Sequence, residues 1–206
     1  MFRANQLTYP KLLIYSYYQR YITILPSAVC NKSYSKFGAK HDFLANDAIE
    51  LSINMDQNLL KQWQAISDNE PDFMVNCSQL CALLMQQIDE ISWCGFYWNR
   101  EKMLVVGAYQ GPLACTRIAY EDGVCGAAFT QRQVQIIDDV SLFEGHIACD
   151  SGSASEIAIP IVQHGQVIGV FDIDSYILKR FDHQFSVYLE KLIQHFVENT
   201  IIPKFV

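Results

Sequence analysis

A run of strand-like segments between amphipathic helices is the feature that most constrains the fold of this chain. Residues 92–174 contain several short runs rich in β-branched and aromatic residues, which is the composition of strands. Apolar residues recur at helical spacing before these runs, in residues 59–66 and 73–88, and after them, in residues 185–196. Strands and helices do not alternate regularly, so the pattern indicates an α+β domain with an antiparallel sheet and helices packed on one face.

Turn residues divide this central region into separate segments. We expect strands over residues 92–98, 103–109, 116–120, 134–138, 156–162 and 166–174, and a short helix over residues 124–131. Pro71 ends the first helical pattern. His164 and Gly165 are expected to form the turn between the last two strands, and residues 146–155, which are rich in Ser and Gly, a polar loop.

Charge and periodicity both change near Met55. Residues 1–54 contain six basic and three acidic side chains, whereas the whole chain of 206 residues has a net charge of −7. We therefore expect one acidic domain over residues 55–202. For residues 1–54 we expect a poorly ordered extension, either a targeting segment or an artefact of the gene model, and a short helix over residues 12–24 that packs on the domain is the alternative.

The acidic balance excludes several classes of partner. Binding to nucleic acid needs a basic surface, which nothing in this composition offers. No apolar run approaches the roughly 18 residues that span a bilayer, and the N-terminus carries no clear secretion signal. We therefore expect no membrane contact and a reducing, cytoplasmic compartment in which cysteine thiols stay free unless they are used for chemistry.

The seven cysteines separate into groups by their surroundings. No Cys-x-x-Cys pair is present, so neither a paired zinc site nor any other metal site is expected. Three cysteines fall within helical or strand patterns and are expected to be core thiols, and three others lie within 35 residues of one another and are candidates for thiol redox chemistry. The core set is Cys77, Cys81 and Cys94, the candidate set is Cys115, Cys125 and Cys149, and Cys30 lies in the N-terminal extension.

Two of the candidate cysteines have features that favour reactivity. Cys125 lies at the start of an expected helix, where backbone N–H groups lower the pKa of a thiol. Cys149 lies in the polar loop, beside Asp150 and three residues after His146, where a substrate has access. A Cys–His hydrolase with His146 as the base is the competing thiol chemistry, although no oxyanion-hole signature accompanies it.

Acidic residues collect on one side of the last two strands. Period-two alternation places Asp172 and Asp174 on the same face of a strand that is otherwise apolar. Glu156 begins the neighbouring strand. Apolar surroundings disfavour the ionised form of a carboxyl group, so at least one of these residues is expected to keep its proton. The alternative is a strand end whose acids cap a neighbouring turn.

These residues carry a resemblance to a known family. The segments that carry it are WCGFY at 93–97, GPLACTRI at 111–118, GVCG at 123–126, GHIACD at 145–150, SE at 155–156 and GVFDIDS at 169–175. Together they resemble the free methionine-R-sulfoxide reductases, which are built on a GAF domain. The resemblance implies a central antiparallel sheet of about six strands with flanking helices, a small closed pocket and a homodimer.

The resemblance also implies roles for individual residues. Cys149 matches the nucleophile and Cys115 the resolving cysteine, with Cys125 as an auxiliary or alternative nucleophile. Glu156, Asp172 and Asp174 match the acids of the pocket, with Glu156 and Asp174 also among the catalytic residues, whereas Trp93 and Tyr97 match its aromatic wall. The helix-start argument for Cys125 and the motif match for Cys149 favour different nucleophiles, so both stay open.

The implied reaction is reduction of free L-methionine (R)-S-oxide through a cysteine sulfenic acid and an intramolecular disulfide. No cofactor is expected, because an external dithiol such as thioredoxin supplies the electrons. A GAF domain that binds a small molecule or senses redox state without turnover is the alternative function.

Overall fold

A computed structural model of the chain describes residues 58–145 and 152–204. Residues 58–67 are helical, and the elements that follow are α2 (Phe73–Gln87), β1 (Trp93–Arg100), β2 (Met103–Gln110), β3 (Arg117–Ile118), α3 (Gly123–Gln131), β4 (Gln135–Ile137), the 3₁₀ helix η1 (Val140–Leu142), β5 (Ser155–Gln163), β6 (Gln166–Ser175) and α4 (His183–Asn199). The expected extension over residues 1–54 and most of the expected loop at 146–155 lie outside the described residues. No helix in the described ranges is both long and apolar enough to cross a bilayer.

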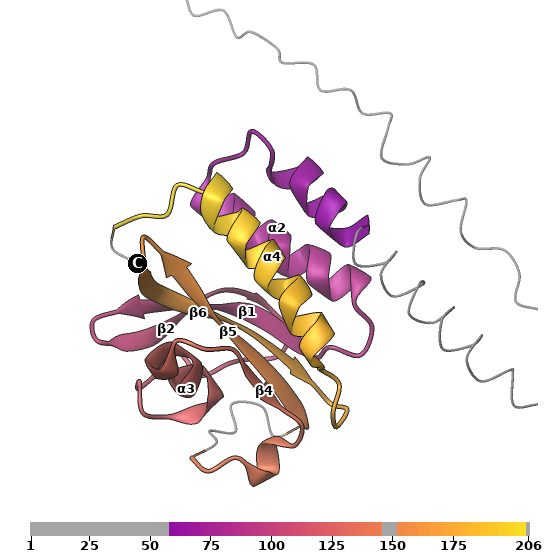
Figure 1. Ribbon diagram of the computed structural model, residues 1–206, viewed down its shortest axis with the longest axis vertical. Helices are drawn as coiled ribbons and strands as arrows, with labels where there is room; N and C mark the ends of the chain where they lie inside the picture. The colour runs from indigo at the N-terminus through magenta and orange to yellow at the C-terminus, as the bar shows by residue number, and fades with distance from the viewer. Residues whose placement is uncertain (1–57, 146–151, 205–206) are drawn as a thin grey trace, which may run out of the picture. The chain divides into compact units, whose positions relative to one another are not determined.

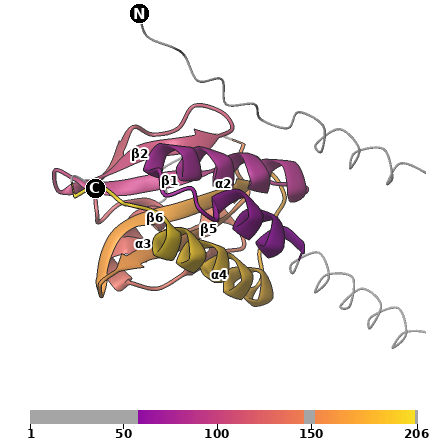
Figure 2. The ribbon, with the colours of Figure 1, turned by 90° about the horizontal axis from the view of Figure 1, so that it is seen from above.

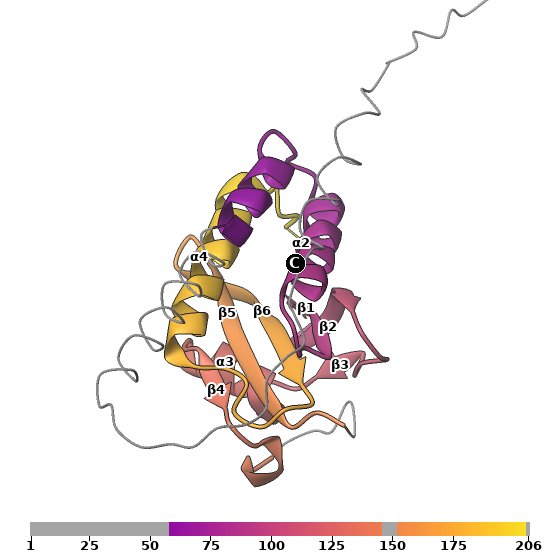
Figure 3. The ribbon, with the colours of Figure 1, turned by 90° about the vertical axis from the view of Figure 1, so that its right-hand side faces the viewer.

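The six strands form one antiparallel sheet in the order β3-β2-β1-β6-β5-β4. Helices α2 and α4 lie on one face of this sheet and α3 lies on the other (Figure 1). Figures 2 and 3 show α2 and α4 over the strands from above and from the side. The antiparallel α+β fold is confirmed, but the expectation that all helices pack on one face is wrong for α3.

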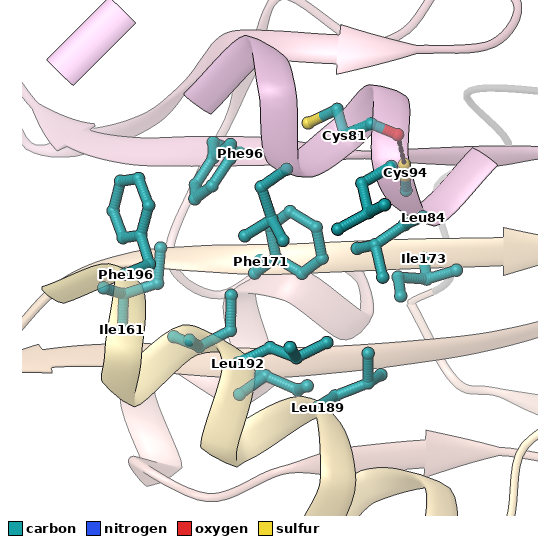
Figure 4. Close-up of a cluster of buried hydrophobic side chains, with 14 of the residues drawn as sticks. Cys81, Leu84, Cys94, Phe96, Ile161, Phe171, Ile173, Leu189, Leu192 and Phe196 are labelled. Carbon is teal, nitrogen blue, oxygen red and sulfur yellow. Dashed lines mark hydrogen bonds between the residues drawn. The ribbon is translucent and has the colours of Figure 1, made fainter. Parts of the chain in front are cut away.

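The main core fills the space between the sheet and the helices α2 and α4. Alternate residues of the central strands point into it, including Phe96 of β1 and Phe171 of β6, whose rings meet edge to face with 4.7 Å between their centroids. Phe196 of α4 packs against Phe96, with 5.0 Å between the ring centroids (Figure 4). Cys77, Cys81 and Cys94 belong to this core as free, buried thiols. The expectation that they are packing residues is confirmed.

The amphipathic patterns located the helices but misassigned two apolar residues. Ile66 and Val75 are 39% and 41% exposed. In the first helix, Ser67 is instead fully buried beside Trp63; its hydroxyl donates to the Trp63 carbonyl and lies 2.9 Å from Nε2 of His195 on α4. A hydroxyl satisfied in this way is tolerated in the core, and hydropathy alone does not reveal it.

The start of α4 allows a direct test of helix capping. Asp182 is the N-cap residue, and its Oδ1 accepts a hydrogen bond from the backbone N–H of Phe185 at 2.7 Å. We expect Asp182→Ala to lower the free energy of unfolding by about 1 kcal/mol, whereas Asp182→Asn, which keeps the acceptor, changes it by a few tenths. Urea denaturation measures both variants, and equal losses would show that the charge of Asp182, and not its capping hydrogen bond, stabilises α4.

Candidate active site

Strand register brings the predicted acids together on the face opposite the main core. Asp174 of β6 pairs with Trp93 on one side and with Glu156 of β5 on the other. Asp172 pairs with Gly95 and with Ala158. Opposing residues of an antiparallel pair point to the same face, so the three carboxyl groups and Trp93 share one surface of three adjacent strands. The predicted common face of Asp172 and Asp174 is confirmed.

Two of these carboxyl groups are deeply buried beside each other. Glu156 and Asp172 are each 6% exposed. Burial, followed by the charges of Asp172 and Asp174, raises the pKa of Glu156 well above its ordinary value. Burial also raises the pKa of Asp172 from 3.8 to about 6, although hydrogen bonding to Cys125 and Glu156 lowers it in part. The site therefore retains a proton at a pH where exposed carboxyl groups have lost theirs.

Cys125 of α3 faces the buried acids. The donor atoms of Cys125, Glu156 and Asp172 all lie within 4.8 Å of one another. Cys125 is the third residue of α3, as predicted, but its thiol pKa is raised, because burial and the facing carboxyl groups outweigh the helix start. The expectation of a lowered pKa at Cys125 is therefore wrong. This thiol remains protonated and donates to Asp172.

Aromatic rings form one wall of the site. Trp93 stacks on Tyr97 and on Tyr109, with 5.8 Å and 5.4 Å between ring centroids. Gly95 makes room for this arrangement, because a Cβ atom there would lie 2.6 Å from Cη2 of Trp93 and 2.4 Å from Cβ of Tyr109. Burial, followed by the nearby Asp172 charge, raises the pKa of Tyr97, so its hydroxyl stays protonated.

Tyr109 is the residue of this wall that the sequence analysis missed. Its position becomes clear once the β1–β2 hairpin register is known, since Tyr109 pairs with Gly95. The sequence of β2 carried a signal for this wall position, because Tyr109 follows two small residues, Gly107 and Ala108. The register was not known, however, and a change of one residue would have placed Tyr109 on the other face.

Cys115 differs in state from the other described cysteines. It is disulfide-bonded, whereas Cys77, Cys81, Cys94 and Cys125 are free. Its side chain is partly buried against the aromatic and apolar cluster of this face, and its carbonyl accepts a hydrogen bond from the Tyr97 hydroxyl at 3.1 Å. The predicted nucleophile Cys149 and the nearby His146 and Asp150 lie outside the described residues.

Two polar atoms in the site have no hydrogen-bond partner among the described residues. They are Oδ1 of Asp172 and Nε1 of Trp93, on side chains 6% and 3% exposed. Buried polar atoms are normally paired, so these atoms favour a polar ligand in the site. An acceptor and a donor on one face suit a molecule that carries both an ammonium and an oxygen acceptor.

The same residues could also hold a cation. Within residues 58–145 and 152–204, the group with suitable donor atoms is Cys125, Glu156 and Asp172. A thiol and two carboxyl groups from three elements have the chemistry of a divalent-metal site, yet they equally suit an organic ammonium. The expectation that the protein uses no metal therefore stays a prediction.

Comparisons with known proteins identify the family of this chain. The sequence pattern of the GAF domain matches residues 77–197. The chain is 42% identical over 136 residues to the free methionine-R-sulfoxide reductase of Escherichia coli. This alignment covers 66% of this chain and 82% of that protein. It is 34% identical over 168 residues to the enzyme of the same name from Saccharomyces cerevisiae, covering 75% of this chain and 93% of that protein.

A solved structure agrees with these sequence matches. The free methionine-R-sulfoxide reductase of Neisseria meningitidis, solved in complex with its substrate, superposes with a TM-score of 0.67 at 36% identity, over 70% of this chain and 87% of that chain. The chain therefore belongs to the GAF-domain family of free methionine-R-sulfoxide reductases.

Proposed function

We propose that this protein reduces free L-methionine (R)-S-oxide to L-methionine. The observation that carries the proposal is the buried group of Glu156, Asp172 and Cys125 beside an aromatic wall, in a chain of this family. The protonated member of the carboxyl pair can donate to the sulfoxide oxygen. The ionised carboxyl groups can bind the ammonium of a free amino acid, and the rings of Trp93 and Tyr97 suit the S-methyl group.

The reaction requires a thiol that attacks sulfur, and we assign this role to Cys149. Its thiolate attacks the sulfoxide sulfur, the oxygen passes to the cysteine sulfur, and methionine leaves a sulfenic acid behind. The Cys115 thiol then attacks this sulfenic acid, so a disulfide forms and water is released. An external dithiol such as thioredoxin reduces the disulfide and completes the cycle.

Two observations support this division of roles. Cys115 is disulfide-bonded while the four other described cysteines are free, which suits a resolving cysteine. The raised pKa of Cys125 makes this residue a poor nucleophile, because the thiolate is the reactive form. Cys125 then serves as an auxiliary group that hydrogen-bonds to Asp172. We further propose that the protein is a homodimer and that it lies in the cytoplasm, where a dithiol reductant is available.

The first prediction concerns substrate and cofactor. With dithiothreitol as reductant, the purified protein should form methionine from the R epimer of free methionine sulfoxide and essentially none from the S epimer. EDTA should leave the rate unchanged, because no step requires a metal. Chromatographic detection of methionine gives both results. No methionine from the R epimer would favour a GAF sensor without turnover, and loss of activity in EDTA would contradict the metal-free mechanism.

The second prediction separates the cysteine roles. Cys149→Ser should abolish turnover, whereas Cys115→Ser should still release about one methionine per protein and then fail to cycle with thioredoxin. Cys77→Ser, in the main core, is the control and should keep thioredoxin-driven activity. Full thioredoxin-supported activity of Cys149→Ser would transfer the nucleophile role to another thiol, with Cys125 the first to test.

The third prediction joins catalysis to stability. The pKa of Asp172 is raised from 3.8 to about 6 in the folded protein, so the stability that the protonated form provides is lost as the pH rises through this range. At pH 8, Asp172→Asn should therefore raise the free energy of unfolding by about 1–3 kcal/mol while lowering kcat/KM by about 100-fold or more.

The control for this experiment is Asp89→Asn, because Asp89 is exposed in the segment that joins α2 to β1. We expect that variant to change neither quantity appreciably. Urea denaturation at pH 4 and pH 8 measures the stability difference, which should shrink at the lower pH. An Asp172→Asn protein that is less stable and fully active would mean that Asp172 is a structural residue.

A further inference from the structure

We infer that Tyr97 is a positioning residue for the disulfide chemistry of Cys115, in addition to being part of the aromatic wall. Its hydroxyl donates to the backbone carbonyl of Cys115 at 3.1 Å, in a structure in which Cys115 is disulfide-bonded. Tyr97 does not act on a reacting sulfur. It holds the backbone that carries one, so its effect on chemistry passes through Cys115. This inference rests on the proposed role of Cys115 as the resolving cysteine.

Tyr97 can hold this position because its own strand is rigid. It lies in β1, at the centre of the sheet, where its backbone pairs with Val106 of β2 and Val170 of β6. The side chain is 2% exposed and its ring stacks on Trp93. The hydroxyl therefore has little freedom to move, which is what a positioning hydrogen bond requires.

Cys115 lies in a connection that needs such support. It belongs to the segment between β2 and β3 and lies outside both strands. The next carbonyl, that of Thr116, accepts from the backbone N–H of Val106 at 3.1 Å. Tyr97 of β1 and Val106 of β2 thus hydrogen-bond to consecutive carbonyl groups. The hydrogen bond to Cys115 comes from a side chain, so a substitution can remove it.

The hydrogen bond persists over the working pH range, because burial and the nearby acids keep the Tyr97 hydroxyl protonated. The hydroxyl donates to the Cys115 carbonyl, whereas Asp172 acts on it through its charge. Loss of the hydroxyl should therefore affect disulfide formation more than the first reduction of substrate.

Tyr97→Phe tests the inference, because it keeps the ring and removes the hydroxyl. In a single turnover, we expect disulfide formation to slow about fivefold more than methionine release, the factor that corresponds to one neutral hydrogen bond. Rapid quenching with a thiol-alkylating reagent follows the disulfide. Tyr120→Phe is the matched control, since it loses a hydroxyl that donates to Asn99 and keeps its stacking on Phe129; it should change neither rate.

A second measurement does not depend on methionine sulfoxide. In glutathione redox buffers, the Cys115 disulfide of Tyr97→Phe should be about fivefold easier to reduce at equilibrium. A protein that makes no methionine would overturn the proposed function and leave this equilibrium readable. An unchanged equilibrium together with unchanged disulfide formation would overturn the positioning role, as would equal slowing of methionine release and disulfide formation, which indicates only the aromatic wall.

A second variant covers the case in which Tyr97→Phe does not fold, as judged by circular dichroism. A ring-fluorinated tyrosine incorporated at position 97 keeps the hydroxyl and makes it a stronger donor. We expect that protein to form the disulfide at least as fast as the unchanged protein and to hold it more firmly against glutathione. A disulfide that is easier to reduce in the fluorinated protein would contradict the inference.

Discussion

The antiparallel register of β1, β6 and β5 is the constraint on which the site depends. It places Trp93, Asp174 and Glu156 in one row across the sheet, and Gly95, Asp172 and Ala158 in the next. Asp172 is therefore flanked by two of the smallest side chains, which leaves space beside its carboxyl group. The ring of Trp93 lies over Gly95 and Cys125 of α3 approaches Asp172. A shift of one residue in β6 would send both aspartates into the main core.

The two faces of the sheet have opposite energetic roles. One face buries aromatic and aliphatic side chains under α2 and α4, and this burial stabilises the fold. The other face buries Glu156 and Asp172, whose raised pKa values reflect a loss of stability near neutral pH. Acids kept partly protonated by burial suit proton donation to a substrate oxygen, so the main core offsets the energetic cost of this chemistry.

Much of this arrangement was predictable from local patterns, and the exceptions have physical causes. Strand alternation identified the common face of Asp172 and Asp174 because period two depends only on the backbone. The side on which α3 packs was not predictable, since Val124, Cys125 and Ala128 meet residues distant in sequence. The sequence predicts a lowered pKa for Cys125 because the start of a helix is a local feature. The carboxyl groups that raise this pKa instead come from β5 and β6, which are distant in sequence.

The sheet also separates cysteines that would otherwise compete. Cys94 lies on β1 between Trp93 and Gly95, yet its side chain points to the main core, where Sγ lies 3.4 Å from the Cys81 carbonyl (Figure 4). Cys115 and Cys125 belong to the cluster on the opposite face. Thiol–disulfide exchange requires one sulfur to reach another, and the intervening strands prevent this between the two sets. The sheet therefore keeps the core thiols of Cys77, Cys81 and Cys94 apart from Cys115 and Cys125.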